Sequence, residues 1–189
     1  MIASDHLFFG LSDQIAYGAP FVGNSVLYMN GFMDAAGIVT ADVVGLSLGA
    51  QMAIGVAIEN PERVRKLVVI DSAGMGKEFP LLYKLANLPV FGRLVIRPNR
   101  WGLDNYFMTM EVVDSEFPDD DVYKRYAYDV TLADGHAAAT RSVVSVITDF
   151  DGQKLIFSDD EFRSICVPVL AIWGEHDPLF QIGHGYRLA

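Results

Sequence analysis

The sequence has one cysteine, few basic residues and no long uncharged run, and each scarcity excludes a class of protein. Cys166 is alone, so no internal disulfide can form, and the reducing cytoplasm is the expected setting. Lys and Arg number 14 against 24 Asp and Glu, and the formal net charge of −10 argues against nucleic acid or an anionic membrane as a partner. The longest uncharged run lies between Asp42 and Glu59. It is shorter than the roughly 20 apolar residues of a membrane helix.

The residues that could bind a metal or a phosphate group do not form a recognisable site. The four histidines are not spaced as metal-ligand pairs. Asp119-Asp120-Asp121 lacks the alternating spacing and the glycine turn of a calcium loop. Gly74-Met75-Gly76-Lys77 lacks the first glycine and the final hydroxyl residue of a phosphate-binding loop. Cys166 lies in an apolar stretch, so we expect a small buried hydrophobic residue there. No metal and no cofactor are expected, and the partner is a small molecule.

What the chain does have is enough hydrophobic sequence for a packed core. Of its 189 residues, 51% are hydrophobic and 20% are charged, as in globular proteins. This length suits one domain, or one domain that carries an inserted subdomain.

The most informative stretch is Asp42–Ala50, in which an apolar strand runs into Gly45-Leu46-Ser47-Leu48-Gly49 and leaves as a helix of small residues. This order of strand, tight turn and helix is typical of a nucleophile elbow. We expect the turn to hold Ser47 in a strained backbone conformation, and expect Gly45 and Gly49 because a side chain at either position would collide. The alternative is an ordinary turn with Ser47 as the N-cap of the helix.

Val44-Gly45-Leu46-Ser47-Leu48-Gly49-Ala50 resembles the nucleophile segment of the α/β-hydrolase superfamily. The resemblance implies a parallel sheet flanked by helices, with Ser47 as the nucleophile and the backbone amide of Leu48 as one oxyanion donor. Serine, where dehalogenases and epoxide hydrolases of this fold have aspartate, points to acyl chemistry or to hydrolysis of carbon–carbon bonds in vinylogous diketones.

A second resemblance lies near the end of the chain. The apolar run 167–173 predicts a strand, and Trp173-Gly174-Glu175-His176-Asp177 resembles the family segment whose aspartate is the acid of the catalytic triad. Asp177 would lie past the carboxyl end of a strand, where the active sites of open parallel sheets assemble. An Asp-Pro turn is the other interpretation. Asp71, which ends the strand predicted at 67–71, is a second candidate acid.

Between these segments the pattern is helical. The resemblance places residues 75–160 as a helical cap inserted into a core made of residues 1–74 and 161–189. Within it we expect helices from about 119 to 132 and from 136 to 147. Aromatic residues of the cap would bound the substrate, although they would also be needed to pack its helices. They are Phe79, Tyr83, Trp101, Tyr106 and Phe107, together with Leu82.

Two parts that the family would supply have no match in the sequence. Ala3–Asp13 resembles a family segment that follows three strands and a His-Gly loop, and the triad histidine belongs beyond a further strand after Asp177. His184 is the only histidine after Asp177, only seven positions on, and His6, His136 and His176 precede the acid. We therefore expect a partial α/β-hydrolase fold, truncated at both ends and lacking the catalytic histidine. The alternative function is an inactive hydrolase-derived fragment. The nucleophile strand would then be an exposed sheet edge, which invites self-association or a homo-oligomer.

Overall fold

The computed structural model describes residues 1–16, 18, 20–81, 84, 88 and 121–188. In chain order the elements are α1 (Phe21–Ala35), β1 (Ala41–Leu46), α2 (Leu48–Glu59), a short 3₁₀ helix (Pro61–Arg63), β2 (Val64–Ile70), α6 (Asp121–Thr131), α7 (His136–Ile147), α8 (Asp159–Arg163), β3 (Val169–Ile172), α9 (Ile182–Gly185) and a final 3₁₀ turn (Tyr186–Leu188).

The three described strands form one parallel sheet in the order β1-β2-β3. The unit β1–α2–β2 is therefore a parallel crossover, and α2 ends before Asn60-Pro61, since a residue that precedes proline disfavours the helical conformation. Because the strands are parallel, their carboxyl ends meet at one edge of the sheet, where residues 47, 71 and 173–177 follow them.

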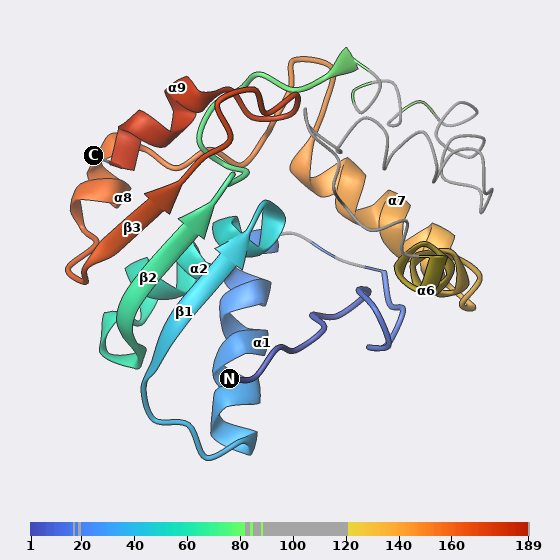
Figure 1. The fold of residues 1–189 in the computed structure, drawn as a ribbon, viewed down its shortest axis with the longest axis horizontal. Coiled ribbons are helices and arrows are strands. Elements are labelled where there is room, and N and C mark those ends of the chain that lie inside the picture. Colours follow the sequence, from blue (N-terminus) through green and yellow to red (C-terminus); the bar gives the residue numbers. More distant parts are fainter. Residues whose placement is uncertain (17, 19, 82–83, 85–87, 89–120, 189) are drawn as a thin grey trace.

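One face of the sheet is covered by α2, which is itself covered by α1 (Figure 1). Every residue of α2 from Ala50 to Val56 is buried, as expected of a helix packed between a sheet and a second helix. The main core lies in this layer, with Ile54, Leu67 and Val69 inaccessible to solvent.

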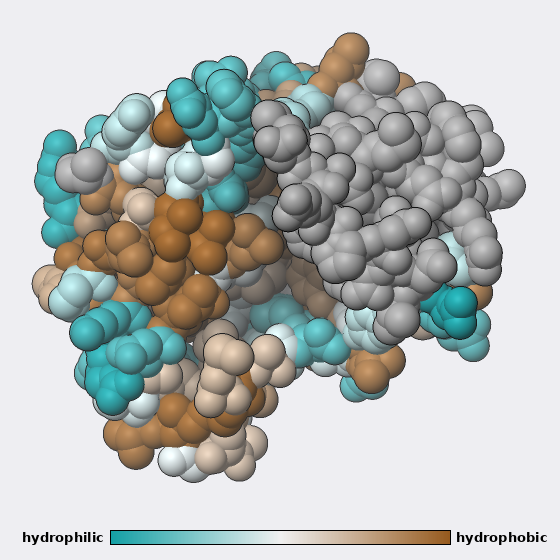
Figure 2. Space-filling model, in the orientation of Figure 1, coloured by the Kyte–Doolittle hydropathy of each residue, from teal (hydrophilic) through white to brown (hydrophobic). Residues whose placement is uncertain are grey.

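The other face carries two apolar rows that lie across all three strands. The paired positions are Val44, Val68 and Leu170 in one row and Leu46, Ile70 and Ile172 in the next. Val44, Leu46 and Leu170 expose 63%, 62% and 55% of their surface. Figure 2 shows this patch over the strands, and we refer to these six residues as the open face.

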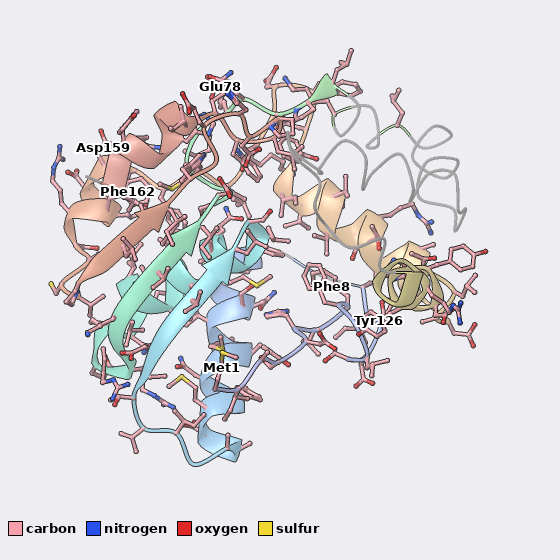
Figure 3. All side chains as sticks on the ribbon, viewed as in Figure 1. Met1, Phe8, Glu78, Tyr126, Asp159 and Phe162 are labelled. Carbon is pink, nitrogen blue, oxygen red and sulfur yellow. The ribbon has the colours of Figure 1, made fainter. Side chains whose placement is uncertain are left out.

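The N-terminal segment crosses from α1 toward α6 and α7. Phe8, labelled in Figure 3, packs in a second cluster with Phe21 of α1, Met52 of α2 and Ala139 and Val143 of α7. This cluster connects α7 to the layer that covers the sheet.

Several local predictions hold and others are wrong. α7 has the predicted bounds. Gly37, just after α1, adopts the left-handed conformation typical of a helix end, and the Ile38 amide donates to the Met33 carbonyl at 2.8 Å. β2 begins at Val64 and not at Leu67, since Arg65 pairs with Asp42 on β1 across the strands. Cys166 is exposed rather than buried, because it precedes β3, whose pattern is mostly exposed.

Candidate active site

Ser47 lies at the tip of β1, in the turn that leads into α2. Its backbone has φ 55° and ψ −117°, a conformation that residues with a side chain rarely adopt. The Ser47 amide donates to the Ile70 carbonyl at 2.9 Å, and the Ser47 carbonyl accepts from the Ala73 amide at 3.1 Å. These two bonds tie the turn to the end of β2, so the strain expected at Ser47 is present and is maintained by the neighbouring strand.

Only one of the two glycine positions in the turn requires glycine. A Cβ at Gly45 would lie 2.5 Å from both the Ala50 Cα and the Gly49 carbonyl oxygen, which are backbone atoms that cannot yield. A Cβ at Gly49 would meet no atom of the described residues within 4 Å. The crowding expected at Gly45 is present, and the crowding expected at Gly49 is wrong, since position 49 faces open space at the start of the helix.

Ser47 occupies the N-cap position of α2, but its hydroxyl makes no capping hydrogen bond. The simpler alternative for this turn, a serine retained to cap the helix, is therefore not supported. The amides of Leu48 and Gly49 begin the helix and have no acceptor within it. The start of α2 consequently presents amide donors and the positive end of its dipole beside Ser47.

Ser47 and Leu48 line an open cavity of about 310 Å³, within the size range of small-molecule sites. Its described wall is mainly apolar and comes from the N-terminal segment, α7 and the loops after β2 and β3. It includes Phe8, Phe9, Phe79, Val144, Leu179 and Phe180. Phe79 and Phe180 stack with their ring centroids 5.7 Å apart. Of the aromatic residues expected at the substrate site, Phe79 is therefore in the wall. Leu82, Tyr83, Trp101, Tyr106 and Phe107 lie outside the described residues.

Two buried glutamines at this cavity were not recognised as site residues from the sequence. Gln51, on α2 one turn after Ser47, donates to the Leu155 carbonyl at 2.8 Å. Gln153 accepts from the Gly74 amide at 2.7 Å and donates to the Gly76 carbonyl at 2.6 Å. Gln51 thus ties α2 to Leu155, and Gln153 ties the loop after β2 to its own segment. Gln51 could have been recognised from the sequence, because it is a polar residue in a mainly apolar helix. No sequence pattern marks Gln153 as a site residue.

α7 contributes the polar side of the cavity. The His136 ring lies 3.2 Å from the Gln14 side-chain oxygen through Nδ1 and 3.3 Å from the Thr140 hydroxyl through Nε2. Burial lowers the pKa of His136, which favours the neutral ring. Both ring nitrogens of His136 are therefore engaged, which fixes the orientation of the ring at the cavity.

The structure brings Asp177 and Asp71 together at the carboxyl ends of β3 and β2. Asp177 Oδ1 accepts from the amides of Leu179 and Phe180 at 2.6 and 2.9 Å, so its side chain organises the loop that supplies two wall residues of the cavity. Asp71 Oδ1 accepts from the Gly174 amide at 2.7 Å. Burial raises the pKa of Asp71, and the neighbouring charge of Asp177 raises it further, against the lowering effect of the Gly174 bond.

The remaining histidines are engaged or placed elsewhere. His184 is buried against Gly76, and its Nε2 lies 2.9 Å from Glu78 Oε2. Glu78 lies beside α9 in Figure 3. The His6 ring packs against Tyr28 at a tilt of 48°, with ring centroids 4.2 Å apart. His176 is exposed in the loop before Asp177.

Neither a metal site nor a membrane helix is found in the part of the chain that the structure describes. No group of three or more His, Cys, Asp or Glu side chains there could hold a metal ion. No helix within the same ranges combines the length and hydrophobicity needed to cross a membrane. Asp119 and Asp120 of the acidic triplet lie outside the described residues, and Asp121 begins α6.

The parallel crossover and the strained serine turn are features of one class of protein. The family model for the alpha/beta hydrolase fold matches residues 1–189, so the chain belongs to the α/β-hydrolase family. The fold predicted from the serine segment is thereby confirmed.

Individual relatives are hydrolases of two kinds. The 2-hydroxymuconate semialdehyde hydrolase of Pseudomonas putida is 42% identical over 81 residues, which is 43% of this chain and 28% of the relative. The carboxylesterase YbfK of Bacillus subtilis strain 168 is 28% identical over 82% of this chain and 47% of the relative. The chain thus spans less than half the length of either of these curated proteins.

Solved structures agree on the fold. A meta-cleavage product hydrolase from Pseudomonas fluorescens IP01 superposes with a TM-score of 0.72 at 22% identity, over 96% of this chain and 64% of the other. The 2-hydroxy-6-oxo-6-phenylhexa-2,4-dienoate hydrolase from Rhodococcus sp. strain RHA1 gives 0.78 at 19% identity over the same shares. At these identities the likeness concerns the fold alone.

Proposed function

We propose that this chain carries the nucleophile and the acid of a serine hydrolase, which cleaves an ester or a related carbonyl or C–C bond of a small, largely apolar substrate. The observation that carries the proposal is the strained backbone of Ser47 at the edge of the apolar cavity, beside the start of α2. A backbone strained at a hydroxyl residue that faces a ligand-sized cavity is the arrangement expected of a nucleophile. The names of the two curated relatives support both bond types.

In the proposed mechanism Ser47 Oγ attacks the substrate carbonyl carbon while its proton passes to a histidine. The carbonyl electron pair moves onto oxygen, where the Leu48 amide stabilises it; losing one such donor typically costs about 100- to 1000-fold in rate. Collapse of this intermediate breaks the bond to the leaving group, which takes the proton from the histidine. Water then hydrolyses the acyl-enzyme by the same steps.

Asp177 is proposed to hold that histidine in the required tautomer. The histidine itself is proposed to be none of the four in this sequence. His184 is paired with Glu78, and the two ring nitrogens of His136 lie against the Gln14 side chain and the Thr140 hydroxyl. The His6 ring packs at a tilt on Tyr28, and His176 precedes the acid in the chain. The same placement of the four histidines favours a second candidate, an inactive fragment of a hydrolase, because an enzyme without its general base keeps only modest catalysis.

The domain division and the setting of the chain belong to the same proposal. Residues 75–160 would form a cap on a core of residues 1–74 and 161–189, and α7 supports this because it lies over the Ser47 cavity. A cytoplasmic setting is supported by the single free cysteine, Cys166.

A fluorophosphonate probe tests the proposal, because it modifies only a serine that is activated as a nucleophile. The purified 189-residue chain would be treated with the probe, and the modified residue found by peptide mass spectrometry. Stoichiometric labelling at Ser47, lost in Ser47→Ala and kept in Ser145→Ala, would show an active nucleophile. Ser145 is a suitable control because it is an exposed serine on α7.

Absence of labelling in this chain, with labelling of Ser47 in a version extended at both ends, would support the inactive-fragment candidate instead. Absence in both versions would refute the serine hydrolase. Where labelling occurs, hydrolysis of a p-nitrophenyl butyrate ester against hydrolysis of a vinylogous diketone distinguishes ester from C–C bond cleavage.

A further inference from the structure

Asp71 stands beside the proposed acid on the adjacent strand. β2 and β3 are paired so that Ile70 lies opposite Ile172, and the Asp71 amide donates to the Ile172 carbonyl at 3.1 Å. The two strands therefore deliver residue 71 and the loop 174–177 to the same place at the carboxyl edge of the sheet.

The Asp71 side chain is directed at that loop by an unusual backbone. Its φ is +41°, which for a residue other than glycine is rare and costs roughly 1–3 kcal/mol. In this conformation Asp71 Oδ1 accepts the Gly174 amide at 2.7 Å. The loop is closed on itself by the Asp177 amide, which donates to the Gly174 carbonyl at 3.3 Å.

Gly174 lies between the two carboxyls. A Cβ built on it would be 3.6 Å from Asp71 Oδ1 and 3.7 Å from Asp177 Cβ. The Asp177 carboxyl raises the pKa of Asp71 by its charge and by a side-chain hydrogen bond, and a hydrogen bond between two carboxyls requires one of them to hold a proton. Each carboxyl uses its Oδ1 for backbone amides, which leaves an Oδ2 on each for the shared proton.

We propose that Asp71 is a positioning residue for Asp177: its carboxyl holds the 174–177 loop through the Gly174 amide and shares one proton with the Asp177 carboxyl. The pair then carries one negative charge when the proton is present and two when it has left, as expected for coupled carboxyls. This inference rests on the proposed function only for the role of Asp177 as the triad acid.

The charged surroundings of Asp71 are simple. Among the described residues, Asp177 is the charged side chain that acts on it, and Glu175 and His176 of the same loop are exposed. The raised pKa of Asp71 agrees with a retained proton. Because the folded chain holds this proton more tightly than the unfolded chain does, stability is fully present below the ordinary aspartate pKa and falls as the pH rises through the raised one.

The first test requires no enzyme activity. The chain would be labelled with ¹³C at the aspartate Cγ and titrated by NMR, with the Asp71 resonance assigned by Asp71→Asn. We expect Asp71 to titrate above the ordinary aspartate range. Asp177→Asn keeps the Oδ1 acceptor for Leu179 and Phe180 but removes the charge that raises the pKa of Asp71, so the Asp71 midpoint should fall.

The control is Glu175→Gln, which removes a charge from the same loop and should leave the Asp71 curve unchanged. An Asp71 resonance that titrates in one step at the ordinary aspartate pKa, or whose midpoint Asp177→Asn does not move, would overturn the proposal. Both results are obtained whether or not the chain is an enzyme.

The second test asks whether Asp71 positions Asp177. It measures the pH profile of fluorophosphonate labelling at Ser47, in whichever version of the protein is labelled. Asp71→Asn keeps an acceptor for Gly174 and donates permanently to Asp177, so the acid limb of the profile should lose the Asp71 step. Asp71→Ala loses both contacts and should slow labelling by about tenfold or more, as other orienting contacts do. An Ala variant with the wild-type rate and profile would refute positioning. No labelling in any version would refute the hydrolase and leave the NMR result standing.

Discussion

The two faces of the sheet have similar sequences and very different surroundings. Val43, Leu67 and Val169 lie in one row toward α2, and Val43 and Leu67 are buried there. Val44, Val68 and Leu170 form the next row toward the open face, where Val44 and Leu170 are more than half exposed. Apolar residues on both faces are typical of parallel strands covered on both sides. Strand hydrophobicity therefore predicts which residues form the sheet, but not which face the described chain covers.

The same difference determines how each part of the candidate site is held in place. The Ser47 turn is fixed by the covered side, through Gly45 against Ala50 and through the buried helix α2. The acid pair at Asp71 and Asp177 is instead fixed by hydrogen bonds in a loop that is mostly exposed. Packing should thus control the serine, and polar contacts should control the acid.

The largest expected effect comes from truncating a leucine on the covered face. Leu67→Ala should cost about 2–5 kcal/mol of unfolding free energy, because Leu67 is fully buried and its removal leaves a cavity. Leu170→Ala, the same change on the open face, should stay within about 0.5 kcal/mol. Urea unfolding followed by circular dichroism measures both. Equal losses would mean that the open face is covered in solution.

The next contrast is between the two glycines of the turn. Gly45→Ala should destabilise the chain by about 1–3 kcal/mol, since the methyl group would meet the backbone of Ala50. Gly49→Ala has free space and a better helix former, so it should be neutral or stabilising by up to about 1 kcal/mol. A Gly45→Ala chain as stable as wild type in the same urea titration would show that the crossing of β1 and α2 is looser than described.

A smaller effect isolates the strain at Ser47. Ser47→Ala keeps a Cβ at a residue whose φ is 55°, whereas Ser47→Gly removes the Cβ that makes this conformation unfavourable. The glycine variant should exceed the alanine variant by about 1 kcal/mol in unfolding free energy. If alanine were the more stable, as in a regular helix, the turn would carry no strain.

The smallest effect on stability is expected on the open face, where the readout is association. Leu46→Lys should change the unfolding free energy by no more than about 0.5 kcal/mol. It should nevertheless weaken self-association, because a charge on an exposed edge strand such as β1 opposes pairing with another chain. Sedimentation velocity across a concentration series measures this. Lys66→Arg, which keeps the charge on β2, is the matched control, and a chain that is monomeric without any substitution would contradict the expectation.

Much of the fold was predictable because local signals and packing agree. α7 has the bounds expected from its apolar spacing, and α2 ends where Pro61 forbids continuation. The start of β2 was missed because Arg65 and Lys66 suggested a loop, while cross-strand pairing with Asp42 overrides that local preference.

The site divides in the same way. Ser47 was identifiable because the strand, the turn and the helix that define it are adjacent in the sequence. The approach of Asp71 to Asp177 was not, since 106 positions separate residues that only the pairing of β2 with β3 brings together. Gln153 was missed for the same reason, because its hydrogen-bond partners Gly74 and Gly76 are far from it in the sequence.

The attachment of Gln153 has a mechanical consequence for α7. The helix ends at Ile147, and six residues later Gln153 attaches the chain to the loop after β2 by four hydrogen bonds, including one from its amide to the Lys77 carbonyl. At its other end, His136 touches the rest of the protein through Gln14 of the N-terminal segment. Between these two ends, Ala139 and Val143 pack in the cluster with Phe8, Phe21 and Met52, so α7 is attached along its length and the cavity wall that it supplies is held in place.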